Sequence, residues 1–306
     1  MQQFDLLIVG AGVAGLCAAT VAARYGLKVA VVERIGAGGQ VMNVDLIENF
    51  PGFPQNVSGY ELGPLLQEQA EAAGAEFLLD TIDQLEVSGT DRILGGAEGK
   101  IRALAVIVAA GSAKRQLGVP GEERLQGRGV SHCASCDGPL FRKLEVCVVG
   151  GGDSALDEAL SLAKHASRVT IVHRGAAFTA QKILVERVSV TANVDVVFET
   201  EVQEILGEGN VSGVSLRNLR NGEVRIQRAE GVFIYIGLAP HTAFLSGLLR
   251  LSATRHVETD IMMRTSLEGV FAAGDIRAGS VALLAAAAGD GATAAVSAYR
   301  YIKGLR

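Results

Sequence analysis

Short apolar runs that end at a glycine recur along the chain and predict buried strands. The first is residues 6–9, Leu-Leu-Ile-Val, which run directly into Gly10. A wholly apolar run of this length, ended by a turn residue, is typical of a strand whose two faces are both covered. Small and apolar residues follow to about residue 25, and residues 29–32 are again apolar. Strand, helix and strand in this order predict a βαβ unit.

The same order of elements occurs a second time in the middle of the chain. Residues 146–149, Val-Cys-Val-Val, run into Gly150, and residues 169–172, Val-Thr-Ile-Val, predict the strand that follows the next helix. The offset between the copies is constant, since Gly12 corresponds to Gly152. The chain therefore contains two copies of one device.

The glycine spacing in this device points to dinucleotide binding. Gly10, Gly12 and Gly15 form the pattern G-x-G-x-x-G between the first strand and its helix. The first glycine allows a tight turn, the second lets backbone N–H groups approach a pyrophosphate, and the third allows close packing of helix on strand. Glu33 ends the next strand, where a carboxylate accepts hydrogen bonds from ribose hydroxyls. In the second copy Ala155 replaces the third glycine, which the pattern tolerates.

Each copy also has a later apolar run that stops at a glycine, residues 105–110 in the first and residues 232–236 in the second. A third run, residues 270–273, comes after the second copy is finished and ends at Gly274 and Asp275. Its simplest placement is in the first domain, which makes the second domain an insertion. Asp275 at this strand end can accept hydrogen bonds from the ribityl chain of a flavin. The alternative is that it caps the helix that follows, and the two roles are compatible.

These elements predict an α/β protein of two Rossmann-like, three-layer domains, the second inserted into the first. The first domain is expected to comprise residues 1–115 and 242–306, and the inserted domain residues 116–241. With 306 residues, 49% of them hydrophobic, the chain is long enough for two domains with cores of their own.

Charge and hydropathy argue against several classes of function. The formal net charge is -5 and the Lys and Arg residues are scattered, so we expect no basic face for nucleic acid. The first residues run into an apolar strand without a basic leader, and the late apolar run, residues 281–288, is too short to span a bilayer. Four cysteines are too few for a secreted disulfide scaffold. We therefore expect a soluble cytoplasmic enzyme without a membrane partner.

The strongest chemical signal is the pair Cys133 and Cys136, separated by two residues and followed by Asp137. Thiols at this spacing can close a small disulfide ring, and the first thiol of such a pair usually has a lowered pKa. Asp137 can donate or accept a proton beside them. The alternative is half of a zinc site, but Cys17 and Cys147 stand alone in apolar segments and no further ligands are visible. The pattern predicts a redox dithiol and no metal site.

With these motifs the chain resembles the low-molecular-weight thioredoxin reductase family of flavoproteins. The resemblance covers nearly the whole length and is carried by the two glycine turns and by residues 38–40, 48–52, 133–138 and 274–275. It implies bound FAD, a homodimer, and electron transfer through the disulfide to thioredoxin or a thioredoxin-like protein. By this resemblance, Cys136 would lie against the flavin, Cys133 would attack the disulfide of the partner, and Asp137 would manage the proton.

The resemblance also implies two nucleotide sites. The FAD site would be formed by Gly10, Gly12, Ala14, Gly15, Glu33, Arg34, Gly39, Gln40, Asn49, Ala110, Gly111, Gly274 and Asp275. The second site would be formed by Gly150, Gly152, Asp153, Ser154, His173 and Arg174.

The second site departs from the family pattern. Usual members bind NADPH and hold its 2′-phosphate with the arginines of a His-Arg-Arg-x-x-x-Arg segment, of which only Arg174 is present here. Gly175 and Thr179 occupy the other two positions, so NADPH specificity is doubtful. His173 stands where Glu33 stands in the first copy, so the carboxylate that an NADH site prefers is also missing.

A second departure lies near the C-terminus, where the family places an Arg-Gln pair close to the flavin. Residues 282–283 here are Ala-Leu. Because the family includes branches that use ferredoxin as electron donor or hold a second FAD, both departures favour such a branch. The intact turn at residues 150–152 favours some second dinucleotide, either NAD(P)H or a second FAD.

Two other functions remain open from the sequence. The same fold and cysteine pair would serve a dithiol oxidase that passes electrons through flavin to oxygen, with peroxide as product. A non-catalytic redox sensor would bind dinucleotide and change partners when Cys133 and Cys136 are oxidised, because a fold alone does not fix a function.

Overall fold

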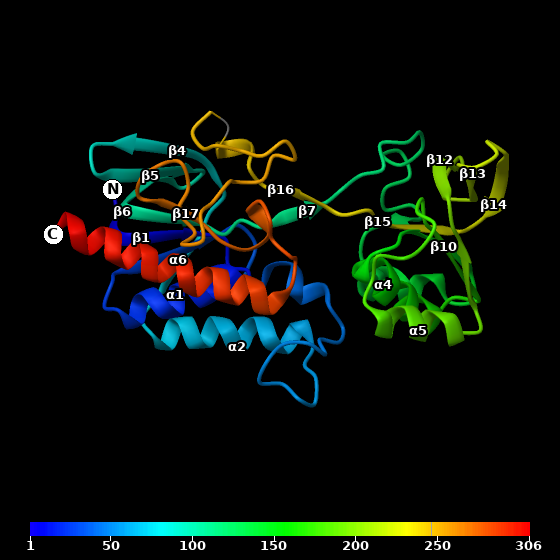
Figure 1. Ribbon diagram of the computed structural model, residues 1–306, viewed down its shortest axis with the longest axis horizontal. Coiled ribbons are helices and arrows are strands. Elements are labelled where there is room, and N and C mark those ends of the chain that lie inside the picture. The colour runs from blue at the N-terminus through cyan, green and yellow to red at the C-terminus, as the bar shows by residue number, and fades with distance from the viewer. Residues whose placement is uncertain (246) are drawn as a thin grey trace. The chain divides into compact units, whose positions relative to one another are not determined.

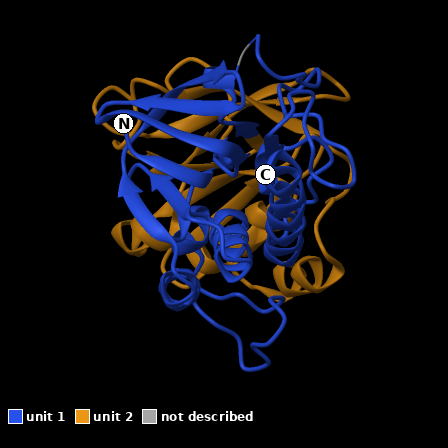
Figure 2. Cartoon of the chain, turned by 90° about the vertical axis from the view of Figure 1, so that its left-hand side faces the viewer, with its two compact units in different colours: residues 1–113, 239–306 blue, residues 114–238 orange. Residues whose placement is uncertain are grey.

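The computed structural model describes residues 1–245 and 247–306 (Figure 1). The chain forms two compact units, coloured separately in Figure 2. Unit 1 comprises Met1–Ala113 and Ala239–Arg306, and unit 2 comprises Lys114–Leu238. The limits expected from the sequence, after residues 115 and 241, fall a few residues beyond these bounds.

Unit 1 is built on a seven-stranded sheet of mostly parallel strands. Its order is β3-β2-β1-β6-β5-β4, and β17 pairs with β6. The pairs β1–β2, β2–β3, β1–β6 and β6–β17 are parallel, whereas β4–β5 and β5–β6 are antiparallel. The bounds are β1 Gln3–Val9, β2 Val29–Glu33, β3 Glu76–Leu79, β4 Ile82–Ser88, β5 Asp91–Gly96, β6 Gly99–Val108 and β17 Val270–Ala272. The late run at residues 270–273 therefore returns to the first sheet, as expected, with Val270 opposite Val106.

Side chains along β1 explain why its sequence is wholly apolar. Leu6 and Ile8 pack with the helices that cover one face of the sheet, whereas Leu7 and Val9 pack into the core on the other face. All four are buried, and burial of each large aliphatic side chain stabilises the fold by about 1.5 to 3 kcal/mol. The covering helices are α1 Val13–Arg24, α2 Gly59–Ala72 and α6 Leu284–Leu305 (Figure 1).

Helices α1 and α6 approach closely because a glycine faces the contact. A Cβ added at Gly291 of α6 would lie 2.1 Å from the carbonyl oxygen of Ala14 in α1.

Within the described residues, no helix is both long and apolar enough to cross a membrane.

Unit 2 repeats the design with a five-stranded parallel sheet of order β11-β10-β9-β15-β8. Its strands are β8 Val130–Ser131, β9 Glu145–Gly150, β10 Arg168–Val172, β11 Val194–Val197 and β15 Gly231–Tyr235. Its helical segments are α3 Ala134–Asp137, η2 Gly138–Phe141, α4 Asp153–Ala163 and α5 Lys182–Val190. The mostly parallel sheet of unit 1 and the parallel sheet of unit 2 confirm the predicted α/β fold class.

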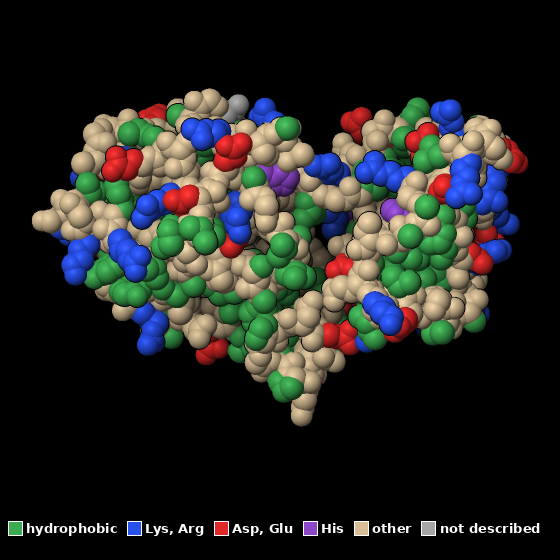
Figure 3. Space-filling model, viewed as in Figure 1, with side chains coloured by type: hydrophobic (Ala, Val, Ile, Leu, Met, Phe, Trp, Pro, Cys, Tyr) green, Lys and Arg blue, Asp and Glu red, His purple; other side chains and the backbone are tan. Residues whose placement is uncertain are grey.

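A separate antiparallel sheet completes unit 2 and consists of β12 Thr200–Leu206, β13 Gly213–Asn218 and β14 Val224–Arg228. Two of its arginines are paired with carboxylates, Arg217 with Glu201 at 3.9 Å and Arg228 with Glu230 at 2.8 Å. Figure 3, in which this sheet lies at the right, shows acidic side chains beside the Lys and Arg side chains. These pairs leave the sheet a mixed rather than a purely basic surface.

The chain passes between the units twice, and the two crossings pair with each other. Strand β7, Ser112–Lys114, and strand β16, Leu238–Pro240, form a two-stranded sheet.

The contact between α1 and α6 gives a first prediction. We expect Gly291→Ala to lower the free energy of unfolding by about 1 to 3 kcal/mol, because the new methyl group meets backbone that cannot move aside cheaply. Gly289→Ala is the matched control on the same helix, since a Cβ there meets no atom within 4 Å and alanine favours helix by up to about 1 kcal/mol. Urea unfolding followed by circular dichroism measures both. Equal stabilities of the two variants would contradict the close approach.

Candidate active site and nucleotide sites

The two cysteines lie on one short helical turn, which we call the redox turn and define as residues 133–137. Cys133 is the N-cap of α3, and Cys136 follows within that helix. Their Cα atoms are 5.3 Å apart and their sulfurs form a disulfide. The backbone N–H of Cys136 also donates to Sγ of Cys133, at 3.3 Å. A donor aimed at this sulfur favours the thiolate form of Cys133 once the disulfide is reduced.

Asp137 is held beside the redox turn by a residue that sequence reasoning missed. The hydroxyl of Ser131 donates to Oδ2 of Asp137, at 2.6 Å, and accepts from the backbone N–H of Cys133, at 3.1 Å. Ser131 ends β8, so the sheet of unit 2 fixes both the start of the turn and the carboxylate. A serine two residues before a cysteine carries no general signal of this role.

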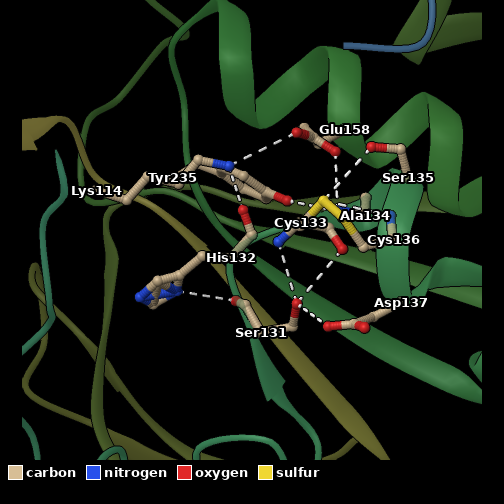
Figure 4. The surroundings of a disulfide bond; sticks show 10 residues. All are labelled: Lys114, Ser131, His132, Cys133, Ala134, Ser135, Cys136, Asp137, Glu158 and Tyr235. Atoms are coloured by element: carbon tan, nitrogen blue, oxygen red, sulfur yellow. Dashed lines mark hydrogen bonds and ion pairs between the residues drawn. A yellow bond between two sulfur atoms is a disulfide. The ribbon is translucent and has the colours of Figure 1, made fainter. Parts of the chain in front are cut away.

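Three further side chains that the sequence did not single out lie against the redox turn (Figure 4). The N–H of Ala134 donates to Oε2 of Glu158 and to the hydroxyl of Tyr235, each at 3.0 Å. Nζ of Lys114 lies 3.8 Å from Oε1 of Glu158 and 4.6 Å from the centre of the Tyr235 ring. The same ammonium donates to the carbonyl of His132. We call Lys114, Glu158 and Tyr235 the Lys-Glu-Tyr cluster.

Burial changes the acidities in this cluster. It raises the pKa of Glu158, while the Lys114 ammonium acts in the opposite direction. It lowers the pKa of Lys114, and here the Glu158 carboxylate opposes the change. Burial also raises the pKa of Tyr235, which keeps the phenol protonated, and lowers the pKa of His132, with a further lowering from Lys114. Each charge in the pair therefore helps its partner to stay ionised.

In the described part of the chain, no group of three or more His, Cys, Asp or Glu side chains is arranged to hold a metal ion. Burial raises the pKa of Cys17 to about 11 and the pKa of Cys147 to about 12, so both thiols stay protonated near neutral pH.

The first glycine turn joins β1 to α1 through close backbone contacts. A Cβ at Gly10, where φ is +104°, would lie 2.4 Å from the Ala109 oxygen, and one at Gly15 would lie 1.9 Å from the Gly10 oxygen. A Cβ at Gly12 would meet no atom within 4 Å, so the backbone there borders open space. A pyrophosphate can approach the first amides of α1 only where such space exists.

Glu33 is fixed beside this turn by backbone donors. Its Oε2 accepts from the N–H of Ala11, and its Oε1 from the N–H of Arg34, both at 2.8 Å. Gly39 also reaches the turn, since its Cβ would lie 3.1 Å from Cα of Gly12. The carboxylate is thus anchored at the end of β2 without being buried.

The remaining residues expected in the first site come from several segments. A Cβ at Gly274 would lie 3.0 Å from Cβ of Ala14, so the turn after β17 approaches the start of α1. Ala110 and Gly111 follow β6, and the Gln40 amide donates to the Ser112 carbonyl. Asn49 lies in the loop before α2, and none of the hydrogen bonds among the described residues joins it to the glycine turn.

Asp275 lies inside the short helix η4, Gly274–Ile276, and its Oδ1 accepts from the Ser280 hydroxyl at 2.9 Å. The alternative that Asp275 caps the helix that follows is wrong, because α6 begins at residue 284 with Leu283 as its N-cap. The chain continues through several residues in extended or turn conformation before it becomes helical.

The second glycine turn is partly covered by the chain that follows β10. Both the N–H and the hydroxyl of Thr179 donate to the Gly151 carbonyl, at 2.8 and 3.2 Å. The Asp153 carboxylate accepts from the backbone N–H and from the side-chain amide of Gln181, each at 2.7 Å. Asp153, at the start of α4, therefore has both oxygens engaged within the protein, while Ser154 is exposed.

His173 is held within unit 2 by contacts of its own. Its Nε2 lies 3.1 Å from the Ala177 carbonyl, and its ring packs near Phe178 and Phe198. A Cβ at Gly151 would lie 2.3 Å from its Nδ1, so the ring fills the space beneath the glycine turn. Arg174 is exposed and is the one cation in residues 173–181.

Comparison with known proteins places this geometry in a family. Residues 4–291 match the profile of the pyridine nucleotide-disulphide oxidoreductases. The thioredoxin reductase of Treponema pallidum is 40% identical over 304 residues, which cover 99% of each chain. The chain belongs to the low-molecular-weight thioredoxin reductase family. It is thus a member of a family of flavin-dependent disulfide oxidoreductases.

Solved structures of thioredoxin reductases agree with this assignment. The Lactococcus lactis enzyme in its FR conformation has a TM-score of 0.97 at 37% identity, with 99% of this chain and 100% of that chain covered. A ferredoxin-flavin thioredoxin reductase from Clostridium acetobutylicum is also similar, with a TM-score of 0.56 at 28% identity and coverage of 100% and 99%.

The family cofactor fits the first glycine turn of this thioredoxin reductase homologue. The open space at Gly12 accommodates a pyrophosphate, and the fixed Glu33 carboxylate provides acceptors for ribose hydroxyls. FAD is the dinucleotide that the family implies.

This fit gives a second prediction. We expect Gly12→Val to reduce bound FAD per chain at least about tenfold, because the branched side chain would occupy the open space at the start of α1 without meeting protein atoms. Absorbance of the purified protein measures flavin content, and circular dichroism checks the fold. Gly209→Val, also in open space but in unit 2, is the control and should keep its flavin. Full flavin content in the Gly12 variant would refute the assignment.

Proposed function

We propose that this enzyme passes electrons through FAD to the Cys133–Cys136 disulfide and on to thioredoxin or a similar protein disulfide, with a donor other than NADPH. The observation that carries the first part is the disulfide on the redox turn, with the Cys136 N–H directed at Sγ of Cys133. When bound and reduced by the donor, the flavin would supply the two electrons that reduce this disulfide.

The proposed exchange begins at Cys133 because its sulfur receives the backbone donor. Its thiolate attacks one sulfur of the partner disulfide, forms a mixed disulfide and releases a partner thiolate. The Cys136 thiolate then attacks Sγ of Cys133, which restores the Cys133–Cys136 disulfide and releases the second partner thiolate. The two released thiolates take up two protons, and we propose that the Asp137 carboxyl beside the turn exchanges protons with the cysteine pair.

The proposal against NADPH rests on residues 173–181. Two of the three positions where the family carries arginines are Gly175 and Thr179 here. Each charge-assisted contact contributes about 1.5 to 3 kcal/mol, so the loss of two weakens phosphate binding by roughly 10²- to 10⁴-fold. The Thr179 hydroxyl is moreover turned inward to the Gly151 carbonyl.

Two candidates for the donor remain, reduced ferredoxin and a second flavin. The structural similarity to a protein named ferredoxin-flavin thioredoxin reductase supports a donor other than NADPH. So does the start of α6, where Ala282, with φ of 52°, and Leu283 occupy the positions of the family's polar pair. We also propose that the enzyme is a cytoplasmic homodimer, because a cycling dithiol fits a reducing compartment and the family resemblance implies a dimer.

The exchange order gives a third prediction. Cys133→Ser and Cys136→Ser should each lower the reduction of thioredoxin at least about 1,000-fold, because neither variant can form the disulfide. Only Cys136→Ser should accumulate a mixed disulfide with thioredoxin, seen by non-reducing electrophoresis, since it keeps the attacking sulfur. Cys147→Ala, which removes a buried free thiol in β9, should retain activity. Trapping by Cys133→Ser instead would reverse the proposed roles, and peroxide formed in proportion to dithiol consumed would favour an oxidase.

The donor gives a fourth prediction. In anaerobic stopped-flow mixing, NADPH and NADH should each reduce the flavin at least about 100-fold more slowly than reduced ferredoxin does. Residues 175 and 179 offer no cation to the 2′-phosphate of NADPH, and His173 stands where an NADH site prefers a carboxylate. Extraction and counting of flavins per chain tests for a second FAD. Rapid flavin reduction by micromolar NADPH would overturn the proposal.

Restoring arginine offers a matched test of the same site. Thr179→Arg should increase the rate of flavin reduction by NADPH more than Gly175→Arg does. A Cβ at Gly175 would lie 2.6 Å from Nε2 of His173, so that variant also disturbs the site. No gain from either variant, together with two flavins per chain, would point to a second FAD in this site.

A further inference from the structure

The Lys-Glu-Tyr cluster surrounds the backbone on both sides of Cys133. The Lys114 ammonium binds the carbonyl of His132, the residue before Cys133. The Glu158 carboxylate and the Tyr235 hydroxyl bind the N–H of Ala134, the residue after it. A positive and a negative charge are thus fixed one peptide group away from the sulfur-bearing residue, in opposite directions along the chain (Figure 4).

The cluster is also an expensive arrangement for a purely structural support. The Lys114 and Glu158 side chains are only 24% and 15% exposed, and Tyr235 is buried. Bringing a cation and an anion out of water costs desolvation energy that apolar side chains of similar size would avoid. At 3.8 Å between Nζ and Oε1, the ion pair offsets that cost less than a closer pair would. Packing alone therefore explains the two charged side chains less well than a role in the function does.

We propose that the Lys-Glu-Tyr cluster positions the redox turn and sets the electrostatic potential at the Cys133 sulfur. The three members act through the backbone of the turn and through their charges, so they are positioning residues. This inference rests on the proposed function, in which the Cys133 thiolate is the attacking group.

If the two charges set the potential at Cys133, removing one or the other should shift the pKa of the Cys133 thiol in opposite directions. Removing the Glu158 charge leaves the Lys114 cation uncompensated, which favours the Cys133 thiolate. Removing the Lys114 charge leaves the carboxylate uncompensated, which disfavours that thiolate. Loss of mere packing would move both variants in the same direction or in neither.

Other titratable groups surround the redox turn and stay unchanged in such variants. Asp137 belongs to the turn, His132 precedes it, and His165 lies near the following Gly138. The remaining acidic groups that act on the cluster or on His132 are Asp157 and Glu122.

The experiment measures the thiol pKa of Cys133 in holoenzyme carrying Cys136→Ser, which keeps the backbone donor at position 136. The rate of alkylation by iodoacetamide at Cys133, located by mass spectrometry, is followed from about pH 5 to pH 10. We expect Glu158→Gln to lower the pKa by about one unit and Lys114→Met to raise it by about one unit. The double variant should return close to the parent value, and Lys114→Arg, which keeps the charge, should match the parent.

Two controls separate charge from packing and from general electrostatics. Asp157→Asn removes the same charge from the neighbouring residue of α4 and should move the pKa by less than about 0.3 units. Tyr235→Phe removes one acceptor of the Ala134 N–H without changing charge and should also have a small effect. Bound flavin and circular dichroism report whether each variant is folded, and Lys114→Gln replaces Lys114→Met if the latter does not fold.

Shifts of equal sign in Glu158→Gln and Lys114→Met, or no shift in both, would overturn the inference. So would a shift in Asp157→Asn as large as that in Glu158→Gln. Failure of the proposed function is read separately, because it would appear as absent thioredoxin reduction in the unmodified enzyme, whereas alkylation of Cys133 requires no thioredoxin.

Discussion

In each unit, the first helix after the glycine turn starts in close contact with the strand before it, and the fold of the unit depends on this contact. In unit 1 this requires glycine at positions 10 and 15, because a side chain at either would collide with backbone oxygen within 2.4 Å. In unit 2 the corresponding contact is made by Ala155, whose Cβ would lie 2.8 Å from one added at Gly150. The close approach directs the first amides of each helix to the carboxyl end of the sheet. It also explains why the strands are apolar on both faces, since helix and opposite layer are drawn onto the same short segment.

The sequence predicts most of the parallel framework because its signals are local. The composition of residues 6–9 and 146–149 alone predicts buried strands. Residues 270–273 are assigned to the first sheet because they follow the end of the second copy, and β17 does pair with β6. The sequence does not predict the antiparallel strands β4, β5 and β12–β14, because their apolar runs are short and are interrupted by polar residues. The cysteine pair could be recognised from the sequence because both thiols lie on one turn and need no distant partner.

The surroundings of the cysteines could not be read in the same way. Lys114, Glu158 and Tyr235 lie on three elements separated by dozens of residues. Nothing in the local sequence indicates that their polar atoms gather around the backbone of His132 and Ala134. His173 illustrates the complementary difficulty. A constant offset from Glu33 located its position at the end of a strand, but the offset says nothing about where the ring packs, and Phe178, Phe198 and Gly151 decide that.

The paired crossings β7 and β16 have a consequence for how such a chain can be assembled. Because unit 2 enters and leaves through adjacent strands, its two ends are neighbours, and unit 1 needs only a short gap to be bridged around the insertion. The entropy of closing that gap is small whatever the length of the inserted segment, provided that segment folds by itself. The redox turn and the second glycine turn therefore belong to one module. The sequence of this module can diverge without disturbing the sheet of unit 1, which carries the first nucleotide site.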